Sequence, residues 1–358
     1  MARVAFFSPM KSPDSLVPSG DREMARNLIQ AIGAQGDQID LISQLRIYDK
    51  TGDSDIQQNL RAAAEAEAQR LIADMPADTD LWVTYHNYYK APDLLGPKVS
   101  AARNIPYVQL ESTRATSRLN GPWSGFARSA HDACDAAAVI YYHTANDLIT
   151  LKRERYGNQD LVELPPFLPI TTLPPASSVN GPMLTVGMMR KGDKLASYHV
   201  LAQALSHLNG DWTLNIAGDG PARADVEAVM APFGARVQFL GQMDRDALQD
   251  AYADASVMAW PGVNEAYGMV YLEAQACGLP VVAQDRPGVC DVLVPTDYPS
   301  VDSGAKGFAA RLQKLLDDPA LRRSIGAKAR AYVADRHLMP AATERFWRAA
   351  RPLIGGTE

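Results

Sequence analysis

Short apolar runs alternate with longer stretches of helical periodicity along the whole chain. The runs span residues 4–7, 39–42, 81–84, 106–110 and 137–142 in the first half and 184–187, 212–216, 237–240, 257–260 and 281–283 in the second. Helical patterns such as 21–32 and 55–73 lie between them. Strands that alternate with helices are typical of βαβ units, whose strands pair in parallel. The sequence therefore predicts an α/β protein with doubly wound parallel sheets.

A proline-rich segment separates the two sets of strands. Residues 165–182 contain six prolines, which lack the backbone N–H that a helix or a central strand needs. A chain of 358 residues also exceeds the size of one ordinary core. We therefore expect two Rossmann-like domains, residues 1–170 and 171–338, that face each other across a cleft. The amphipathic stretch 339–358 is expected to form a C-terminal helix that either crosses back to the first domain or packs on its own.

Charge and cysteine content exclude several classes of protein. The net charge is −6 and neither half is basic, whereas a nucleic-acid-binding domain needs a basic surface. Cys134, Cys277 and Cys290 form no CxxC pair, which indicates buried thiols and no disulfide or zinc framework. No run approaches the roughly 20 apolar residues of a membrane span. We therefore expect a cytoplasmic protein with no nucleic-acid partner and no transmembrane segment, while peripheral contact with a membrane stays open.

The segment 256–282 combines an apolar strand, a loop and a helix. The helix is predicted over residues 268–277, where Gly278 and Pro280 end it. The first amide groups of a helix lack intrahelical acceptors, and its amino end carries a partial positive charge, so such an end binds anions. Gly268 lets a ligand approach the backbone closely. The segment therefore predicts an anion site.

Two glutamates flank this anion site. Glu265 lies in the loop, and Glu273 lies eight positions later in the helix. A carboxylate accepts hydrogen bonds from two neighbouring hydroxyl groups, so sugars and riboses are its natural ligands. The plain alternative is a solvated glutamate on a surface helix. Because Glu273 stands between Leu272 and Ala274 in a helix flanked by apolar strands, we favour a binding role.

The spacing of these glutamates, with Tyr267-Gly268 between them and the sequence EAQACGLPVVA after them, resembles the family 4 retaining glycosyltransferases of the GT-B fold. The resemblance extends over the second half and more loosely over the first. It implies that Glu265 contacts the transferred sugar and that Glu273 binds the nucleotide ribose. It also implies that the backbone of Tyr267, Gly268, Met269 and Val270 contacts the sugar and the diphosphate.

A cationic loop follows the strand 184–187. Arg190, Lys191 and Lys194 stand where the negative charge of a departing diphosphate needs stabilisation. Members of the family often have an arginine directly after Gly187, whereas this chain has Met188. The resemblance therefore implies Arg190 as the substitute, together with either Lys191 or Lys194.

The stretch AGDGPAR, residues 217–223, nearly matches the dinucleotide pattern G-x-G-x-x-G, but Arg223 replaces the third glycine. Because no acidic residue ends the following strand, binding of NAD is disfavoured. The stretch resembles the GDGP turn of GT-B enzymes, which implies that Gly218 shapes the nucleotide pocket. The neighbouring LGQMDRDAL implies contact of Gly241, Gln242 and Met243 with the base.

The first half supplies further candidates. Gly20 begins a predicted helix, where its backbone can approach a phosphate, although Ser19 before it is also a suitable helix cap. His86 ends a strand, and the resemblance implies that it contacts the transferred sugar as a neutral imidazole, with a buried structural histidine as the alternative. Glu111 is a candidate acceptor contact, and Arg114 and Arg118 are candidate anion binders nearby.

Three D-x-D triplets, Asp53/Asp55, Asp78/Asp80 and Asp244/Asp246, occur outside these motifs. None directly follows a strand, so we interpret them as helix caps or connectors. We expect no metal ion, because arginine, lysine and helix dipoles can replace its charge.

The resemblance implies an enzyme that transfers a hexose-type sugar, with retention, from a UDP- or GDP-linked donor. The acceptor is a glycan, a lipid or a small molecule that the sequence does not identify. No other cofactor is expected. The alternatives are a nucleotide-sugar epimerase of the GT-B fold and a non-catalytic protein that binds nucleotide sugars.

Overall fold

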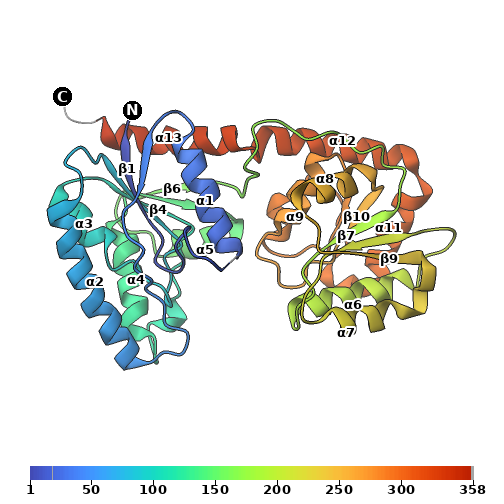
Figure 1. Ribbon diagram of the computed structural model, residues 1–358, viewed down its shortest axis with the longest axis horizontal. Helices are drawn as coiled ribbons and strands as arrows, with labels where there is room; N and C mark the ends of the chain where they lie inside the picture. Colours follow the sequence, from blue (N-terminus) through green and yellow to red (C-terminus); the bar gives the residue numbers. More distant parts are fainter. Residues whose placement is uncertain (18, 356–358) are drawn as a thin grey trace. The chain divides into compact units, whose positions relative to one another are not determined.

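A computed structural model describes residues 1–17 and 19–355 and divides into two compact units, each built around one sheet (Figure 1). Unit 1 comprises Met1–Pro165 and Met339–Glu358, and unit 2 comprises Pro166–Leu338. The first boundary falls at Pro165, within the proline-rich segment and slightly before residue 170, where the sequence analysis set it.

Unit 1 contains six strands, six α-helices and one 3₁₀ turn among the described residues. These are β1 (Arg3–Phe7), α1 (Gly20–Gly33), β2 (Gln38–Leu41), α2 (Ser54–Asp74), β3 (Leu81–Tyr85), α3 (Gly96–Arg103), β4 (Tyr107–Leu110), η1 (Thr116–Arg118), α4 (Ser124–Ala136), β5 (Val139–Tyr142), α5 (Ala145–Arg153), β6 (Asp160–Glu163) and α13 (Met339–Ile354).

The sheet of unit 1 is parallel throughout, in the order β2-β1-β3-β4-β5-β6. Helix α3 contacts both α2 and α4, and α1 and α13 form a second packed pair. The strand order reverses between β1 and β3, so the chain leaves the two neighbouring strands in opposite directions. Such a switch point leaves a crevice at the carboxyl ends of the strands, where ligands of doubly wound proteins bind.

Unit 2 contains five strands, seven α-helices and two 3₁₀ turns. These are β7 (Met183–Val186), α6 (Asp193–Leu205), β8 (Leu214–Ala217), α7 (Arg223–Met230), η2 (Ala231–Arg236), β9 (Val237–Gly241), α8 (Arg245–Asp254), β10 (Val257–Ala259), α9 (Met269–Ala276), β11 (Val281–Val282), α10 (Val289–Val292), η3 (Val301–Ser303), α11 (Gly304–Asp317) and α12 (Pro319–Arg336).

The sheet of unit 2 is also parallel, in the order β11-β10-β7-β8-β9. Helices α6, α7 and α11 pack together, and α9 packs on α12. Figure 1 shows α8 and α9 on one side of this sheet and α6 and α7 on the other. The switch point lies between β7 and β10. The predicted pair of doubly wound parallel sheets is confirmed.

The strands are apolar because helices cover both faces of each sheet. Every residue of β3, LWVTY, and of β7, MLTV, is buried, as expected for parallel strands between two helical layers. Strand β6 was not predicted from the sequence, because Asp160 and Glu163 leave only two apolar residues between them. As an edge strand with half-buried central residues, β6 lacks the apolar run that marked the others.

The cysteines are unpaired. Cys134 and Cys277 are buried, as predicted, whereas Cys290 is half-buried. No helix in the described part of the chain is long and apolar enough to cross a membrane.

Candidate functional site

Two helices of unit 2 begin next to each other at the switch point. Helix α6 follows β7 and α9 follows β10, and these two strands are hydrogen-bonded neighbours. Because parallel strands end at the same edge of a sheet, the amino ends of both helices lie at that edge.

Neither helix start is closed by a side chain. Gly192 precedes α6 with φ 83°, Gly268 precedes α9 with φ 75°, and neither position provides a capping side chain. A left-handed backbone of this kind favours glycine. The amides of the first two residues of each helix, Asp193 and Lys194 in α6 and Met269 and Val270 in α9, therefore remain available to an anion, because the third amides already bond to carbonyl groups. The two helix dipoles reinforce each other at this edge.

The Glu265 carboxylate, in the loop before α9, contacts the first turn of α6. Lys194, in the first turn of α6, forms an ion pair with the Glu265 carboxylate. Trp260 Nε1 donates a hydrogen bond of 3.1 Å to the same carboxylate oxygen. The Lys194 Nζ also lies 5.7 Å from the centroid of the Trp260 ring. Arg190 and Lys191 are exposed, so Lys194 is the lysine that the fold holds against Glu265.

Glu273 points to a different neighbour. The hydroxyl of Tyr252, on α8, donates a hydrogen bond of 2.8 Å to its carboxylate. Burial raises the pKa of Glu273 above its ordinary value, although the Tyr252 hydrogen bond and the charge of Arg245 act in the opposite direction. The two glutamates thus occupy separate places, Glu265 beside α6 and Glu273 beside α8.

Glycines bring three strand-end loops of unit 2 together. A Cβ at Gly218 would lie 2.0 Å from the carbonyl oxygen of Gly187, and one at Gly220 would lie 2.4 Å from that of Met189. The amide of Gly218 donates to the carbonyl of Gly241 at 2.7 Å. These glycines are therefore required for contact between the loops that follow β7, β8 and β9.

The residues after β9 and at the start of α9 differ in exposure. Gln242 is exposed and Met243 is half-buried. Tyr267, Met269 and Val270 are partly buried and pack on the core of unit 2.

Tyr271 is a supporting residue that the sequence analysis missed. It is fully buried, and its hydroxyl donates to the carbonyl of Trp260 at 3.1 Å. A Cβ at Gly262 would lie 2.3 Å from the Tyr271 hydroxyl, and one at Gly268 would lie 2.7 Å from its ring. The loop that carries Glu265 is therefore moulded over Tyr271. The two glycines on either side of Glu265 were the available sequence signal.

In unit 1, His86 lies at the switch point between β1 and β3. Its Nδ1 is 3.3 Å from a carboxylate oxygen of Asp21, in the first turn of α1. Burial lowers the pKa of His86, but the carboxylates of Glu111 and Asp21 outweigh this effect, and the pKa is raised above its ordinary value. The surroundings of His86 therefore stabilise its protonated form relative to an ordinary histidine, whereas the sequence analysis expected a neutral imidazole. Asp21 was missed, although it follows Gly20 directly.

The other unit 1 candidates have distinct surroundings. Glu111 follows β4, and its carboxylate lies 3.6 Å from Nε2 of His143, which follows β5. Arg114 is 2% exposed, and its Nη1 lies 2.6 Å from Asp135, so its charge is neutralised inside unit 1. Arg118 is exposed. Helix α1 begins at Gly20, and Ser19 caps it by accepting a hydrogen bond of 3.2 Å from the amide of Arg22.

The aspartate triplets serve the fold, as predicted. Asp53 caps α2 and Asp244 caps α8. Asp78 and Asp80 bind the side chain and the backbone amide of Arg3.

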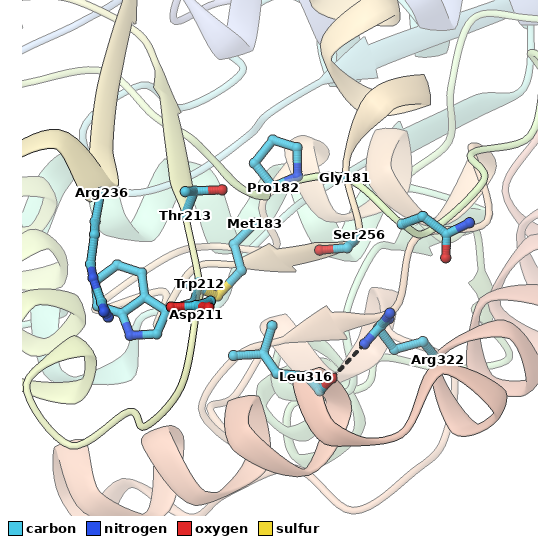
Figure 2. A pocket seen from close by; sticks show the side chains of 11 residues that line it. Gly181, Pro182, Met183, Asp211, Trp212, Thr213, Arg236, Ser256, Leu316 and Arg322 are labelled. Carbon is cyan, nitrogen blue, oxygen red and sulfur yellow. Dashed lines mark hydrogen bonds between the residues drawn. The ribbon is translucent and has the colours of Figure 1, made fainter.

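A shallow pocket of 640 Å³ lies at the opposite edge of the unit 2 sheet, next to the amino ends of β7, β8 and β10 (Figure 2). Figure 2 shows Arg322 directed at the carbonyl of Leu316. Its Nη1 donates to the carbonyls of Leu315 and Leu316 at 2.7 and 2.8 Å. These carbonyls lie in the last turn of α11, so Arg322 closes that helix, and the pocket is separate from the glutamate site.

Comparison with known proteins finds relatives of unit 2. Residues 174–332, almost all of unit 2, match the family described as glycosyl transferases group 1. A GDP-mannose-dependent monoacylated alpha-(1-6)-phosphatidylinositol monomannoside mannosyltransferase of Corynebacterium glutamicum is 34% identical over 131 residues, which cover 34% of each chain. The sulfoquinovosyl transferase SQD2 of Arabidopsis thaliana is 34% identical over 148 residues, 38% of this chain and 26% of that protein. The matched part thus spans about a third or less of these relatives.

Solved structures resemble the whole chain. A sucrose-phosphate synthase from Thermosynechococcus elongatus superimposes with a TM-score of 0.71 at 18% identity and covers 100% of both chains. Anabaena HepE in complex with UDP gives a TM-score of 0.71 at 15% identity over 98% of this chain and 100% of that chain. The chain has the GT-B fold, and residues 174–332 are similar to the group 1 glycosyl transferases.

Proposed function

We propose that this protein is a retaining glycosyltransferase that moves a hexose-type sugar from a nucleotide diphosphate sugar to an acceptor hydroxyl. One observation carries the proposal: the uncapped starts of α6 and α9 meet at the unit 2 switch point, with Lys194 and Glu265 joined between them. This arrangement offers amide groups and a cation to a diphosphate, and carboxylates to the sugars on either side of it. The match of residues 174–332 to the group 1 glycosyl transferases supports it.

Each group has a proposed role at the donor. Arg190 and Lys194 bind the diphosphate, with Lys191 at the exposed edge of the same loop. Glu265 orients the transferred sugar, and Glu273 accepts hydrogen bonds from the ribose hydroxyls. The amides of Tyr267, Gly268, Met269 and Val270 contact the sugar and the phosphates, the strand-end glycines Gly187 and Gly218 shape the pocket, and Gly241, Gln242 and Met243 contact the base. In unit 1, the resemblance assigns His86 to the sugar and the backbone of Gly20 to a phosphate.

The proposed reaction needs no nucleophile from the protein. The bond between the anomeric carbon and the diphosphate oxygen breaks, and the diphosphate leaves with the electron pair. The acceptor oxygen forms its bond to the anomeric carbon on the same face, and its proton passes to the departing phosphate. Arg190, Lys194 and the two helix starts stabilise the charge that develops on the phosphate, and each such preorganised donor typically contributes about 3–4 kcal/mol.

The donor base and the acceptor are proposed only as classes. One relative is named as GDP-mannose-dependent, and one solved neighbour holds UDP-glucose, so a UDP- or GDP-linked donor fits. Named relatives act on an inositol 3-phosphate or on 2-deoxystreptamine. For this chain we keep a glycan, a lipid or a small molecule as the acceptor, and a cytoplasmic location.

Removing the Glu273 carboxylate tests the donor assignment. We expect Glu273→Ala to weaken binding of UDP or GDP roughly ten- to hundredfold, since hydrogen bonds to a charged acceptor contribute about 1.5–3 kcal/mol. Isothermal titration calorimetry measures this affinity. Asp302→Ala, an exposed acidic residue in η3, is the control. Equal nucleotide affinity of Glu273→Ala and Asp302→Ala would reject the ribose assignment.

Incubation with donor alone separates the alternatives. A transferase converts donor in proportion to the acceptor supplied, and the product keeps the anomeric configuration, which NMR reports. Conversion of the donor sugar into its epimer without acceptor would favour an epimerase. Tight nucleotide binding with no turnover would favour a binding protein.

A further inference from the structure

A row of aromatic rings leads away from His86 at the carboxyl edge of the unit 1 sheet. The ring centroids of His86 and Tyr88 are 4.9 Å apart, those of Tyr88 and Tyr89 are 5.6 Å apart, and those of Tyr89 and Trp123 are 5.7 Å apart. The first three residues follow β3, and Trp123 directly precedes α4. The row therefore extends from the residue proposed to contact the transferred sugar into the loops of unit 1.

Two cations occupy the far end of this row. The Lys90 Nζ lies 5.6 Å from the Tyr89 centroid and 5.4 Å from that of Trp123. The Arg118 Cζ lies 5.2 and 5.8 Å from the same two rings. Within the described residues, no carboxylate lies within the 4.0 Å ion-pair distance of either cation. Two like charges that share one pair of rings repel each other, and an anion bound between them would relieve that repulsion.

A tight turn holds Lys90 in place. Tyr89 and Lys90 are the central residues of a turn in which the amide of Ala91 donates to the carbonyl of Tyr88 at 2.9 Å. The Lys90 carbonyl accepts a hydrogen bond of 2.9 Å from the amide of Asp49. The backbone that carries the Lys90 side chain is therefore held by hydrogen bonds within the turn and to the segment at Asp49.

The Trp123 ring is fixed by the same segment. Its Nε1 donates to the carbonyl of Asp49 at 3.3 Å. A Cβ at Gly52 would lie 2.5 Å from Pro122 and 3.3 Å from Trp123, so glycine is required beneath the ring. The Asp49 side chain is buried and accepts hydrogen bonds from Gln57 and from the amides of Thr51 and Gly52. This carboxylate therefore serves the loop, not the two cations.

We propose that Lys90 and Arg118 bind a phosphate group carried by the acceptor. The rings of Tyr88, Tyr89 and Trp123 then lie against the less polar faces of the acceptor molecule. A guanidinium stacked on rings keeps its N–H edge free for a bidentate anion. Two positive charges match a phosphate monoester, whose charge near neutral pH is about −1.5 to −2, better than a single carboxylate charge. The inference names the acceptor class of the proposed glycosyltransferase and rests on that function.

Matched pairs of compounds test the inference on the full chain. The protein is saturated with UDP, so that the diphosphate positions of unit 2 are filled, and is titrated with glucose 6-phosphate or glucose, and with glycerol 3-phosphate or glycerol. We expect the phosphorylated member of a pair to bind at least about tenfold more tightly than its neutral partner. Added salt should reduce the difference, because both cations are near the surface.

Two variants identify the groups responsible. Lys90→Gln with Arg118→Gln should abolish the preference for the phosphorylated compound, whereas Arg128→Gln, an exposed arginine on α4, should keep it. Unchanged thermal unfolding midpoints show that both variants remain folded. A double variant that keeps the wild-type preference would overturn the inference.

Vesicles distinguish a soluble acceptor from a lipid headgroup. Vesicles of phosphatidylcholine with and without phosphatidic acid present the same phosphate monoester on a surface. Binding that depends on Lys90 and Arg118, either to the soluble phosphates or to the vesicles, supports the inference and shows whether the acceptor is soluble or a lipid. If neither experiment shows such binding, the inference is overturned. UDP affinity, measured in the same samples, distinguishes failure of the acceptor inference from failure of the proposed function. If UDP binds and its binding depends on Glu273, but the phosphorylated compounds are not preferred, only the acceptor inference is rejected. If UDP does not bind, the proposed function is rejected.

Discussion

At the scale of single residues, three of the five described residues other than glycine with positive φ lie near the switch points, whereas Asn104 and Val179 lie elsewhere. His86, Glu111 and Asn264 have φ values of 66°, 53° and 53°, which place residues other than glycine in the left-handed region. Each such residue costs about 1–3 kcal/mol and persists only where the surroundings enforce it. His86 and Glu111 end neighbouring strands, and Asn264 precedes Glu265. The strain therefore supports function at both switch points.

The Asp21 carboxylate should control the charge of His86. We expect Asp21→Asn to lower the pKa of His86, because the variant removes one of the carboxylates that raise it. NMR titration of the His86 ring protons measures the change. Asp14→Asn, an exposed aspartate in the preceding loop, should leave the His86 titration as it is.

The same pair predicts how stability depends on pH. Since the folded-state pKa of His86 is raised, its contribution to stability is fully present below the ordinary value and is lost as the pH rises through the folded-state pKa. The difference in unfolding free energy between wild type and Asp21→Asn should therefore shrink with rising pH. A difference that grows as His86 loses its proton would contradict the ion pair.

At the scale of elements, α13 shows how an amphipathic helix finds its place. Trp347 Nε1 donates to the carbonyl of Ile32 at 2.9 Å, and the Tyr141 hydroxyl donates to that of Phe346 at 2.7 Å. Arg351 forms an ion pair of 2.9 Å with the buried Asp37 and stacks on Trp347. Helix α13 is thus part of unit 1, although the chain passes through all of unit 2 before reaching it.

Truncation of Phe346 tests the contribution of this helix. Phe346 is 1% exposed and stacks on Tyr141 with centroids 5.1 Å apart. We expect Phe346→Ala to lower the free energy of unfolding of unit 1 by about 3–5 kcal/mol, because it leaves a cavity between α13 and β5. Urea denaturation followed by tryptophan fluorescence measures the loss. Arg348→Ala, with a side chain 68% exposed, should change stability by less than about 0.5 kcal/mol, and similar losses in both variants would contradict this packing.

At the scale of the whole molecule, each unit places its candidate residues at its own switch point. Unit 1 brings Asp21 and His86 to the ends of β1 and β3, and unit 2 brings Lys194 and Glu265 to the ends of β7 and β10. Two helix starts and the cationic loop give unit 2 a concentration of positive charge at this switch point.

Chelation of metal ions tests whether this charge suffices. We expect donor turnover to continue unchanged in excess EDTA, because helix dipoles and cationic side chains stabilise the departing diphosphate. A metal-dependent glycosyltransferase in the same buffer, which should stop, is the control. Loss of turnover that added Mg²⁺ or Mn²⁺ restores would show that a metal is needed.

The sequence by itself determined the class of fold and located the segment proposed to bind the donor. Apolar runs mark the strands because helices cover both faces of each sheet, and this burial pattern is local in the chain. Ten of the eleven strands in the described part of the chain were predicted; β6 was missed because Asp160 and Glu163 leave only two apolar residues between them. The spacing of Glu265 and Glu273 could also be recognised from the sequence, because one loop and one helix that are continuous in the chain carry both residues.

Only the tertiary structure decided which residues meet. Strand order is set by pairing between distant segments, so the switch points that unite α6 with α9 and Asp21 with His86 have no local signature. The fold also gave similar residues different surroundings. Lys194 pairs with Glu265 whereas Lys191 is exposed, and Arg114 is buried whereas Arg118 is exposed. Neighbouring positions look alike in sequence because burial and charge pairing depend on what packs against them. The sequence thus predicted which types of residue form the candidate site, and the packing around each sheet determined which of these residues contact one another.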